Sequence, residues 1–463
     1  MSTTGTGQSV ARARPGEHAP EGTAEQTREH PEEVGPKDAA DVPADAIRPP
    51  FRRPKLLAPL AVALLLALAA VVQLARPQPA TDIEIDADAV AFTFPGRSAL
   101  PWPQQGQAAV AVPGTGTVGV HGPQRPAPIA SVAKVMTAYV LLGKHPLTGD
   151  DPGPTIEVDA KAVAEGRAKD ESRIEGLSVG QRFSQRDLLK MLMIPSGNNI
   201  ARLLARWSTK SDTEAAFVRE MNDAAKRLGM ADTRYTDPSG LDAGTVSTAV
   251  DQLKLAEAVM AYDVFRATVA LPSATVDGLA EPLINNMGDL LLADGLSIRG
   301  VKTGSNTPAG GTLMWAAYKT VGDRTPLILG TVLDQRAPAP DPDGANSLTL
   351  VKENSRRLVA AVRAALVSAK PVRRGQVVGH VDDGFGGRVP VVVSDDLTAV
   401  GVPGQRVDVR FTPTAAAPPE SAKAGTEVGT VTIGSGADAV RARVTLKDDL
   451  EGPSIPTQLT RLN

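Results

Sequence analysis

Between residues 185 and 230 the apolar positions recur three or four residues apart, which is the spacing of an amphipathic helix. The last of these segments begins near Asp212 and ends at Gly229, a residue type that commonly follows a helix. A later stretch, 347–369, places its apolar residues on one stripe. The pattern predicts four helices: "SQRDLLKMLM", "NIARLLARW", "DTEAAFVREMNDAAKRLGM" and "SLTLVKENSRRLVAAVRAALVSA".

Other segments have the short apolar runs and turn residues of paired strands. "AAVAV" and "TVGVHG" flank the turn "PGTG", and "GTLMWAAYKTV" and "TPLILGTVLD" flank "GDR". Strands interspersed with helices over 82–370 predict an α+β domain, in which an antiparallel sheet packs with helices.

Beyond Lys370 the helical pattern stops. Short strand-like runs, such as "GQVVGHV", "RVPVVVS" and "EVGTVTI", recur between Gly, Pro and Asp turns. We therefore predict a separate, small all-β domain over 371–463.

The N-terminal part of the chain has a different composition. Residues 1–50 hold nine acidic residues, five basic residues and seven prolines, which predicts a disordered tail. Residues 56–74 carry no charge and are long enough to cross a bilayer as one transmembrane helix. Arg52, Arg53 and Lys55 precede this stretch, so we expect the tail in the cytoplasm and the remainder outside, in a single-pass protein of the cell membrane. A cleaved signal peptide is the alternative, although the segment before the apolar core is long for one.

Composition excludes several kinds of chemistry. The net charge of −3 gives no reason to expect a nucleic-acid partner. The chain has no cysteine, so thiolate catalysis, disulfides and zinc–cysteine sites are excluded. It has only five histidines and no H-E-x-x-H, so we expect no metal, no cofactor and, in a hydrolase, a base other than histidine.

The segment "PIASVAKVMTAYVLL" places Ser131 and Lys134 three residues apart at the start of a predicted helix. Residues at this spacing lie on one face, so the hydroxyl and the amine can meet. Taken alone, the pattern is also typical of an N-cap serine followed by a solvated lysine.

Two further motifs follow in order. Ser196 and Asn198 belong to "SGN" in a break between two helices, and Lys302–Gly304 form "KTG" on a strand that enters a hairpin. Each has an ordinary interpretation, as a helix cap or as an exposed charge on an edge strand. Together, S-x-x-K, S-x-N and K-T-G make up the signature of serine penicillin-binding proteins and serine β-lactamases.

Over about residues 82–369 the chain resembles the low-molecular-mass penicillin-binding proteins, the D-alanyl-D-alanine carboxypeptidases of serine peptidase family S11. The blocks that carry the resemblance are "PIASVAKVMTAYV", "LLKMLMIPSGNN", "AFVREMNDAAKRLGMADTRYTDPSGLD" and "GVKTGSNTPAGGTL". The resemblance implies the fold shared by penicillin-binding proteins and serine β-lactamases. Two positions that bear on substrate preference and rate depart from the family pattern: Asn199 stands where an aspartate is usual, and Ser305 where a histidine is frequent.

A serine hydroxyl becomes a good nucleophile when a base takes its proton, and a neutral lysine can be that base. Lysine in water has a pKa of about 10.4, and burial or a second cation favours its neutral form. The resemblance implies that Ser131 is acylated and Lys134 is the base. It also implies that Ser196 relays a proton to the leaving amine and that Asn198 orients Lys134 and holds the substrate amide.

The resemblance assigns substrate binding to the third motif. Lys302 and Thr303 would hold the C-terminal carboxylate of the peptide, with Gly304 and Ser305 completing the strand. The backbone N–H groups of Ser131 and Ser305 would form the oxyanion hole. The implied substrate is a peptidoglycan stem peptide ending in D-alanyl-D-alanine, and the implied covalent inhibitors are β-lactams.

Two alternatives remain on sequence grounds. One is a serine β-lactamase, although no E-x-x-L-N block lies between the second and third motifs to position a deacylating water. The other is a catalytically silent protein that binds the cell wall with the same fold.

Overall fold

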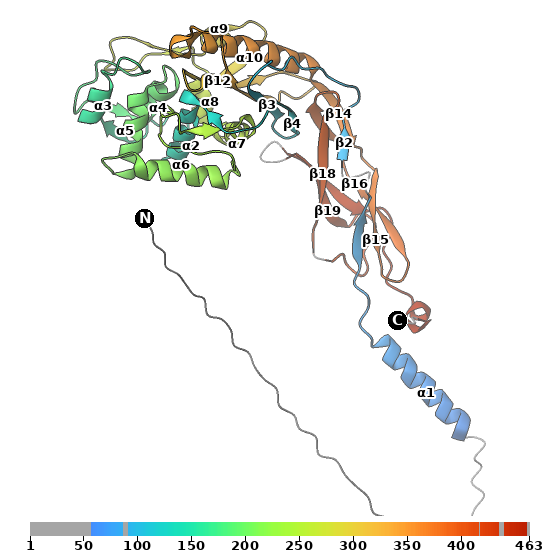
Figure 1. The fold of residues 1–463 in the computed structure, drawn as a ribbon. Coiled ribbons are helices and arrows are strands. Elements are labelled where there is room, and N and C mark those ends of the chain that lie inside the picture. Colours follow the sequence, from blue (N-terminus) through green and yellow to red (C-terminus); the bar gives the residue numbers. More distant parts are fainter. Residues whose placement is uncertain (1–56, 87–90, 416, 435–438, 461–463) are drawn as a thin grey trace, which may run out of the picture. The chain divides into compact units, whose positions relative to one another are not determined.

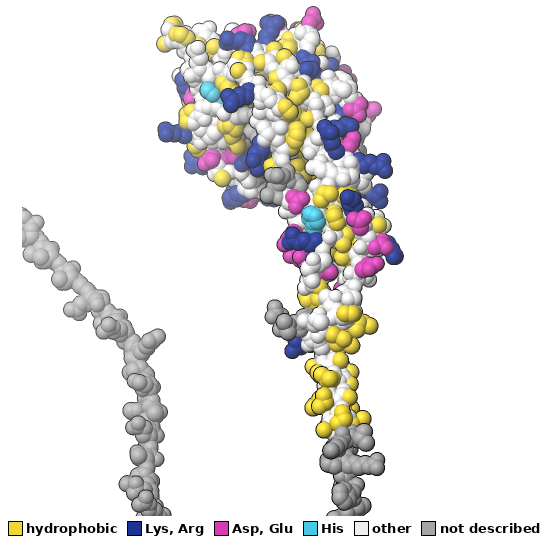
Figure 2. Space-filling model, turned by 90° about the vertical axis from the view of Figure 1, so that its right-hand side faces the viewer, with side chains coloured by type: hydrophobic (Ala, Val, Ile, Leu, Met, Phe, Trp, Pro, Cys, Tyr) yellow, Lys and Arg dark blue, Asp and Glu magenta, His cyan; other side chains and the backbone are white. Residues whose placement is uncertain are grey.

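The computed structural model describes residues 57–86, 91–415, 417–434 and 439–460 (Figure 1). The predicted tail, 1–50, lies outside these residues. Of the predicted apolar segment, 56–74, the described part forms helix α1 (Leu57–Leu74), and from Leu60 onward its leucines and valines are largely exposed (Figure 2). Eighteen residues at 1.5 Å each extend about 27 Å, less than the hydrocarbon core of about 30 Å. Within the described residues, no helix combines the length and the apolar character needed to cross a membrane, so the predicted transmembrane helix is not confirmed.

A five-stranded antiparallel sheet forms the centre of the predicted α+β domain. Its strand order is β11-β12-β13-β3-β4, and both predicted hairpins are present within it. The strands are β3 (Gln107–Val112), β4 (Gly116–His121), β11 (Ile298–Asn306), β12 (Gly310–Tyr318) and β13 (Leu327–Gln335).

Helices cover both faces of this sheet (Figure 1). Successive side chains of a strand point to opposite faces, so Leu313 and Trp315 pack against α10, whereas Met314 lies in the cluster formed with the other helices. The helices are α2 (Lys134–Lys144), α3 (Ala160–Glu165), α4 (Gln185–Met193), α5 (Asn198–Thr209), α6 (Ala215–Arg227), α7 (Ala249–Val259), α8 (Asp263–Val269), α9 (Asp289–Leu292) and α10 (Ala345–Ala365).

Short elements connect these helices and strands. They are β5 (Ala127–Pro128), η2 (Ala130–Ala133), β6 (Thr155–Glu157), β7 (Arg182–Ser184), β8 (Val246–Ser247), β9 (Ser273–Ala274), β10 (Leu283–Ile284) and η3 (Pro342–Gly344). The pairing of β5 with β8 joins the chain just before Ser131 to a distant segment.

The C-terminal part is built from strands, as predicted. Within the described residues it holds a sheet of order β1-β15-β16-β20-β19-β18-β2 and a separate β14–β17 pair. The elements are β14 (Val367–Val372), β15 (Val377–Asp382), β16 (Arg388–Val393), β17 (Leu397–Gly401), β18 (Arg406–Pro413), β19 (Glu427–Ile433), β20 (Val440–Leu446) and the short helix α11 (Ile455–Thr460).

The strand pairing does not match the predicted boundaries at 82 and 370. Strands β1 (Asp82–Ile85) and β2 (Ala91–Thr93) precede the α+β domain in sequence, yet they pair with β15 and β18 of the C-terminal sheet. Helix α10 ends at Ala365, and β14 begins two residues later in order to pair with β17. The pairings of β1 with β15 and of β2 with β18 join segments about 300 residues apart, which local periodicity does not reveal.

Candidate active site

Ser131 lies in the 3-10 turn η2, directly before helix α2. The N-cap residue of this turn is Ile129 and no side chain caps it, so Ser131 is not an N-cap serine. The preceding residue, Ala130, has a φ of 45°, a left-handed conformation that is costly for a residue with a Cβ. Such strain clusters at functional sites, and here it lies next to the predicted nucleophile. Ser131 itself is partly exposed, as a nucleophile must be.

Lys134 is fully buried, which contradicts the interpretation as a solvated lysine. Its Nζ lies 2.8 Å from the Oγ of Ser131 and 2.8 Å from the carbonyl oxygen of Ser239, and it also donates to the Oδ1 of Asn198. The first two motifs therefore meet at one amine.

Burial, reinforced by the charge of Lys302, holds the pKa of Lys134 well below its usual value. A neutral amine has two N–H donors and one lone pair. The oxygens of Asn198 and Ser239 that face Lys134 can only accept, so they take the two N–H groups. The lone pair is then left for the hydroxyl of Ser131, which is the arrangement a general base requires.

Ser196 and Asn198 occupy the break between α4 and α5, as the sequence predicted. Ser196 has a φ of 71° and is 1% exposed. Its Oγ has no hydrogen-bond partner among the described residues. Buried hydroxyls are normally satisfied, so a strained and unpaired one two residues before Asn198, which contacts Lys134, is suited to a substrate or a transferred proton.

The K-T-G strand, β11, runs along Ser131. A Cβ on Gly304 would stand 2.8 Å from the backbone nitrogen of Ser131. Strand β11 is an edge strand of its sheet, yet Lys302 and Thr303 are only 1% and 3% exposed, so neither is a surface side chain. Ser305 follows on the same strand and is partly exposed.

Burial, followed by the charge of Lys352, lowers the pKa of Lys302 to about 7. The Nζ of Lys302 donates to the carbonyl oxygen of Thr303 at 2.9 Å. The side chain of Lys302 therefore loses its positive charge as the pH rises through neutrality.

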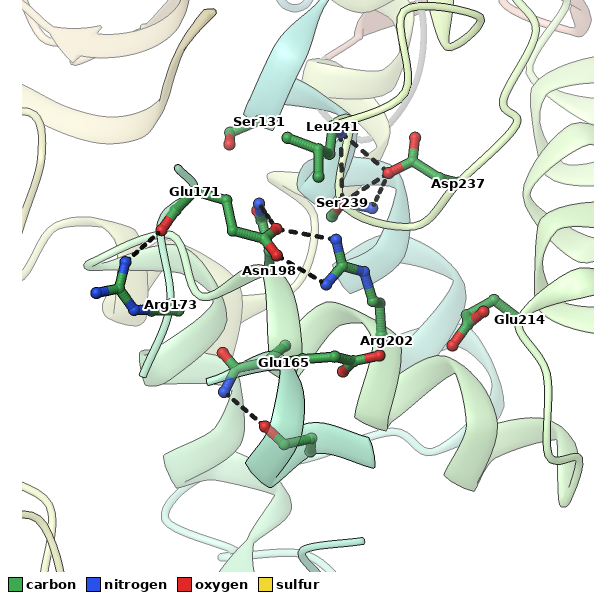
Figure 3. A network of polar contacts seen from close by, with 12 residues as sticks. Ser131, Glu165, Glu171, Arg173, Asn198, Arg202, Glu214, Asp237, Ser239 and Leu241 are labelled. Atoms are coloured by element: carbon green, nitrogen blue, oxygen red, sulfur yellow. Dashed lines mark hydrogen bonds and ion pairs between the residues drawn. The ribbon is translucent and has the colours of Figure 1, made fainter. Parts of the chain in front are cut away.

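The loop that contains "DPSGLD" has a role that the sequence did not reveal. The carboxylate of Asp237 accepts hydrogen bonds from the backbone N–H groups of Ser239 and Leu241 and from the hydroxyls of Ser239 and Thr245. Figure 3 shows the bonds that join Asp237 to Ser239 and Leu241. They fix the segment whose carbonyl, that of Ser239, accepts from Lys134. The signal available in the sequence was the Asp-Pro-Ser-Gly turn, because aspartate commonly bonds to backbone groups two residues ahead.

Glu171 and Arg202 were also missed. The Nδ2 of Asn198 donates to the Oε2 of Glu171 at 2.5 Å, and Arg202 donates to both oxygens of that carboxylate, at 3.1 and 2.9 Å (Figure 3). Glu171 comes from the irregular segment between α3 and β7 and carries no periodic signal. The described residues contain no group of histidines and carboxylates that could hold a metal ion.

Comparisons with known proteins agree with the motifs. The family model for D-alanyl-D-alanine carboxypeptidases, peptidase S11, matches residues 113–336. The D-alanyl-D-alanine endopeptidase of Pseudomonas aeruginosa is 33% identical over 248 residues, which make up 52% of this chain and 75% of that protein. The D-alanyl-D-alanine carboxypeptidase DacD of Escherichia coli is 29% identical over 260 residues, 54% of this chain and 60% of that protein.

The fold also matches a solved structure. Penicillin-binding protein 5 of Haemophilus influenzae superimposes with a TM-score of 0.54 at 19% identity, covering 75% of this chain and 98% of that one. This match confirms the predicted fold of penicillin-binding proteins and serine β-lactamases for the part of the chain that superimposes. The chain belongs to peptidase family S11, the serine-type D-alanyl-D-alanine carboxypeptidases.

Proposed function

We propose that this protein removes the terminal D-alanine from peptidoglycan stem peptides through an acyl-enzyme on Ser131, and that penicillins acylate the same serine. One observation carries the proposal. The Nζ of the fully buried Lys134 lies 2.8 Å from the Oγ of Ser131, and both of its other partners accept N–H groups. A silent wall-binding protein would have no need for a buried amine, because burying an ionisable group is costly even when it is hydrogen-bonded.

In the proposed reaction, the Oγ of Ser131 bonds to the carbonyl carbon of the penultimate D-alanine while its proton passes to Lys134. The negative charge on the carbonyl oxygen is held by the backbone N–H groups of Ser131 and Ser305. The C–N bond then breaks, and the leaving amine takes the proton of Lys134 through Ser196, which makes Lys134 neutral again. Water next attacks the acyl carbon while Lys134 accepts its proton. The bond between that carbon and the Oγ of Ser131 breaks, Lys134 returns the proton to the Oγ, and the shortened peptide leaves.

The carboxylate of the substrate is proposed to bind Lys302 and Thr303. A protonated Lys302, buried in the strand beside Ser131, would attract that carboxylate strongly because little water screens it. This contact explains a preference for a free C-terminus, which is what distinguishes a carboxypeptidase.

The similarity to the Pseudomonas aeruginosa endopeptidase favours a second candidate, cleavage of D-alanyl cross-links between stem peptides. Purified cross-linked dimers and linear pentapeptides, compared at equal concentration, would separate the two activities. We expect the protein to release D-alanine from the linear pentapeptide faster than it cleaves the cross-link of the dimer.

We further propose that the protein is held at the cell membrane with its catalytic domain outside. The support is the uncharged stretch 56–74 and the basic residues Arg52, Arg53 and Lys55 before it. Protease added to intact cells should digest the catalytic domain and spare an epitope placed before residue 50. A mature N-terminus near residue 76 would indicate cleavage instead.

The function is tested with a fluorescent penicillin, followed by mapping of the labelled peptide and an assay of D-alanine release. Ser131→Ala should abolish both label and release, whereas Ser178→Ala, at an exposed position, should change neither. Full labelling of the Ser131 variant would refute the proposal. An acyl-enzyme that hydrolyses in well under a second would point to a β-lactamase, and a wild-type protein that takes no label would point to the silent alternative.

A further inference from the structure

The amide of Asn198 has two chemically different ends, and the network around it uses both. Its Oδ1 accepts from Lys134. Its Nδ2 donates to Glu171 at 2.5 Å (Figure 3). An amide turned by 180° would present an N–H group to Lys134. That group would compete for the one lone pair that has to receive the proton of Ser131.

Glu171 decides between these two orientations, because an ionised carboxylate can only accept. With Nδ2 bound to it, Oδ1 is the end left to face Lys134. We propose that Glu171, held by Arg202, is a positioning residue for the reaction, which sets the orientation of the Asn198 amide and so directs the lone pair of Lys134 at Ser131. This inference rests on the proposed function of Ser131 and Lys134 and adds a residue that does not touch the substrate.

The carboxylate of Glu171 is rigidly placed. Its side chain is 8% exposed, and both of its oxygens accept from Arg202. Arg202 lies four residues after Asn198 on α5, so the two side chains extend from one face of the helix and meet the same carboxylate. A forked guanidinium restricts a carboxylate more than a single contact would.

The segment that carries Glu171 is fastened to the same helix by Asn199. The Oδ1 of this buried residue accepts from the backbone nitrogen of Ile174 at 3.0 Å, and its Nδ2 donates to the carbonyl oxygens of Ile174 and Ala162. An aspartate could accept the first bond but could not donate the other two. The departure from the usual S-G-N-D pattern therefore has a structural consequence, which is a second anchor for the segment of Glu171.

The pair also acts on Lys134 electrostatically. After burial and Lys302, the pKa of Lys134 is lowered further by Arg202 and raised by Asp237 and Glu171. Removing the charge of Glu171 takes away one of the two carboxylates that raise the pKa of Lys134, so this pKa falls. Removing the charge of Arg202 takes away one of the cations that lower it, so this pKa rises. The two substitutions therefore shift the acid limb of the pH profile in opposite directions.

The experiment measures the second-order rate of acylation by a fluorescent penicillin between pH 5 and 9. Glu171→Gln should acylate at least about tenfold more slowly on the plateau, because a misdirected base forfeits part of the 10²- to 10⁴-fold that general-base catalysis contributes. Its acid limb should move to lower pH. Arg202→Met should move the acid limb to higher pH, and Glu171→Asp, which keeps the carboxylate, should recover part of the lost rate.

Glu165→Gln is the matched control. Glu165 also pairs with an arginine of α5, Arg206, but it makes no contact with Asn198. This variant should keep the wild-type rate and pH profile even where its thermal stability falls. If the Glu171→Gln variant has the same plateau rate of acylation and the same acid limb as the Glu165→Gln control, the positioning role is refuted.

Two outcomes separate this inference from the function on which it rests. A wild-type protein that takes no label on Ser131 removes the proposed function, and the inference with it. Wild-type labelling together with an unchanged Glu171 variant removes only the inference. If Glu171→Gln does not fold, as judged by circular dichroism, the plateau rate of Arg202→Met decides, because this variant removes both bonds that hold the carboxylate of Glu171. A lower plateau rate supports the positioning role, and a wild-type plateau rate overturns it.

Discussion

The backbone of Gly304 lies directly against the backbone nitrogen of Ser131. A Cβ at position 304 would stand 2.8 Å from that nitrogen and 2.5 Å from the Oγ1 of Thr312, distances that real Cβ atoms do not adopt. The glycine of K-T-G therefore leaves space beside an N–H group that is proposed to stabilise the oxyanion. The space exists because two motifs about 170 residues apart in sequence, on η2 and β11, are in contact.

Gly304→Ala should slow acylation of Ser131 by roughly 10²-fold or more, because loss of one oxyanion donor costs about 3 kcal/mol. The new methyl group forces β11 and Ser131 apart. The rate is measured with a chromogenic penicillin. Gly143→Ala is the control, since a Cβ there meets only the Oη of Tyr262, at 3.7 Å. A near wild-type rate for Gly304→Ala would mean that the N–H of Ser131 is not used.

Lys134→Arg should lose acylation by about 10²- to 10⁴-fold, although it keeps a positive charge. An arginine side chain stays protonated in proteins, so it has no lone pair for the proton of Ser131. Labelling by fluorescent penicillin and D-alanine release should fall together. Acylation at close to the wild-type rate would show that a group other than Lys134 is the base.

Lys302 should produce an alkaline limb in the pH profile of kcat/KM. Its pKa of about 7 means that the free enzyme carries this cation below neutral pH and loses it above. Binding of the substrate carboxylate should therefore weaken as the pH rises from 7 to 9.

Two comparisons check that assignment. Lys302→Arg should remove the alkaline limb, because arginine stays charged throughout this range. A peptide with an amidated C-terminus should react slowly and without that limb. If the amidated peptide shows the same limb as the free acid, the titrating group is not the one that binds the carboxylate.

Local periodicity was enough to predict helices α2, α4, α5, α6 and α10 and both hairpins of the α+β domain, whereas α7 and α8 were not predicted. Helix α10, for example, carries its apolar stripe against Leu313 and Trp315, so burial and sequence spacing agree. Its C-terminal end was missed because β14 competes for residues after 366 through a pairing with β17. The pairing of β1 with β15 was missed because the sequence of a four-residue strand does not indicate which strand it pairs with.

The candidate site was predictable where chemistry requires fixed spacing. Ser131 and Lys134 share a helical turn, and the other two motifs are contiguous in sequence. The turn at Asp237 had a local signal, but its contact with Lys134 through the carbonyl of Ser239 did not, because more than 100 residues separate the two. Glu171 had no signal, because it acts through the amide of Asn198, which only the fold brings near. Residues that orient a site have no spacing rule of their own.

The buried amine of Lys302 should make the protein less stable than it could be, and the deficit should depend on pH. The pKa of Lys302 is about 7 in the folded protein and 10.5 in the unfolded chain. Between these values the unfolded chain binds more protons, so stability rises with pH. Well below pH 7 the full penalty applies, about 5 kcal/mol, and near pH 10.5 it has almost vanished.

Lys302→Met, which keeps the length of the side chain without the charge, should therefore unfold at higher urea concentration than wild type at pH 7. The difference in free energy of unfolding should shrink steadily toward pH 10.5, while D-alanine release is lost at every pH. Lys226→Met, at a solvated position where the side chain is 79% exposed, is the control and should change stability little at either pH. If Lys302→Met increases the free energy of unfolding by the same amount from pH 7 to pH 10, the increase arises from packing alone. Lys302 would then not be a cation that the protein keeps, at a cost in stability, for binding the substrate.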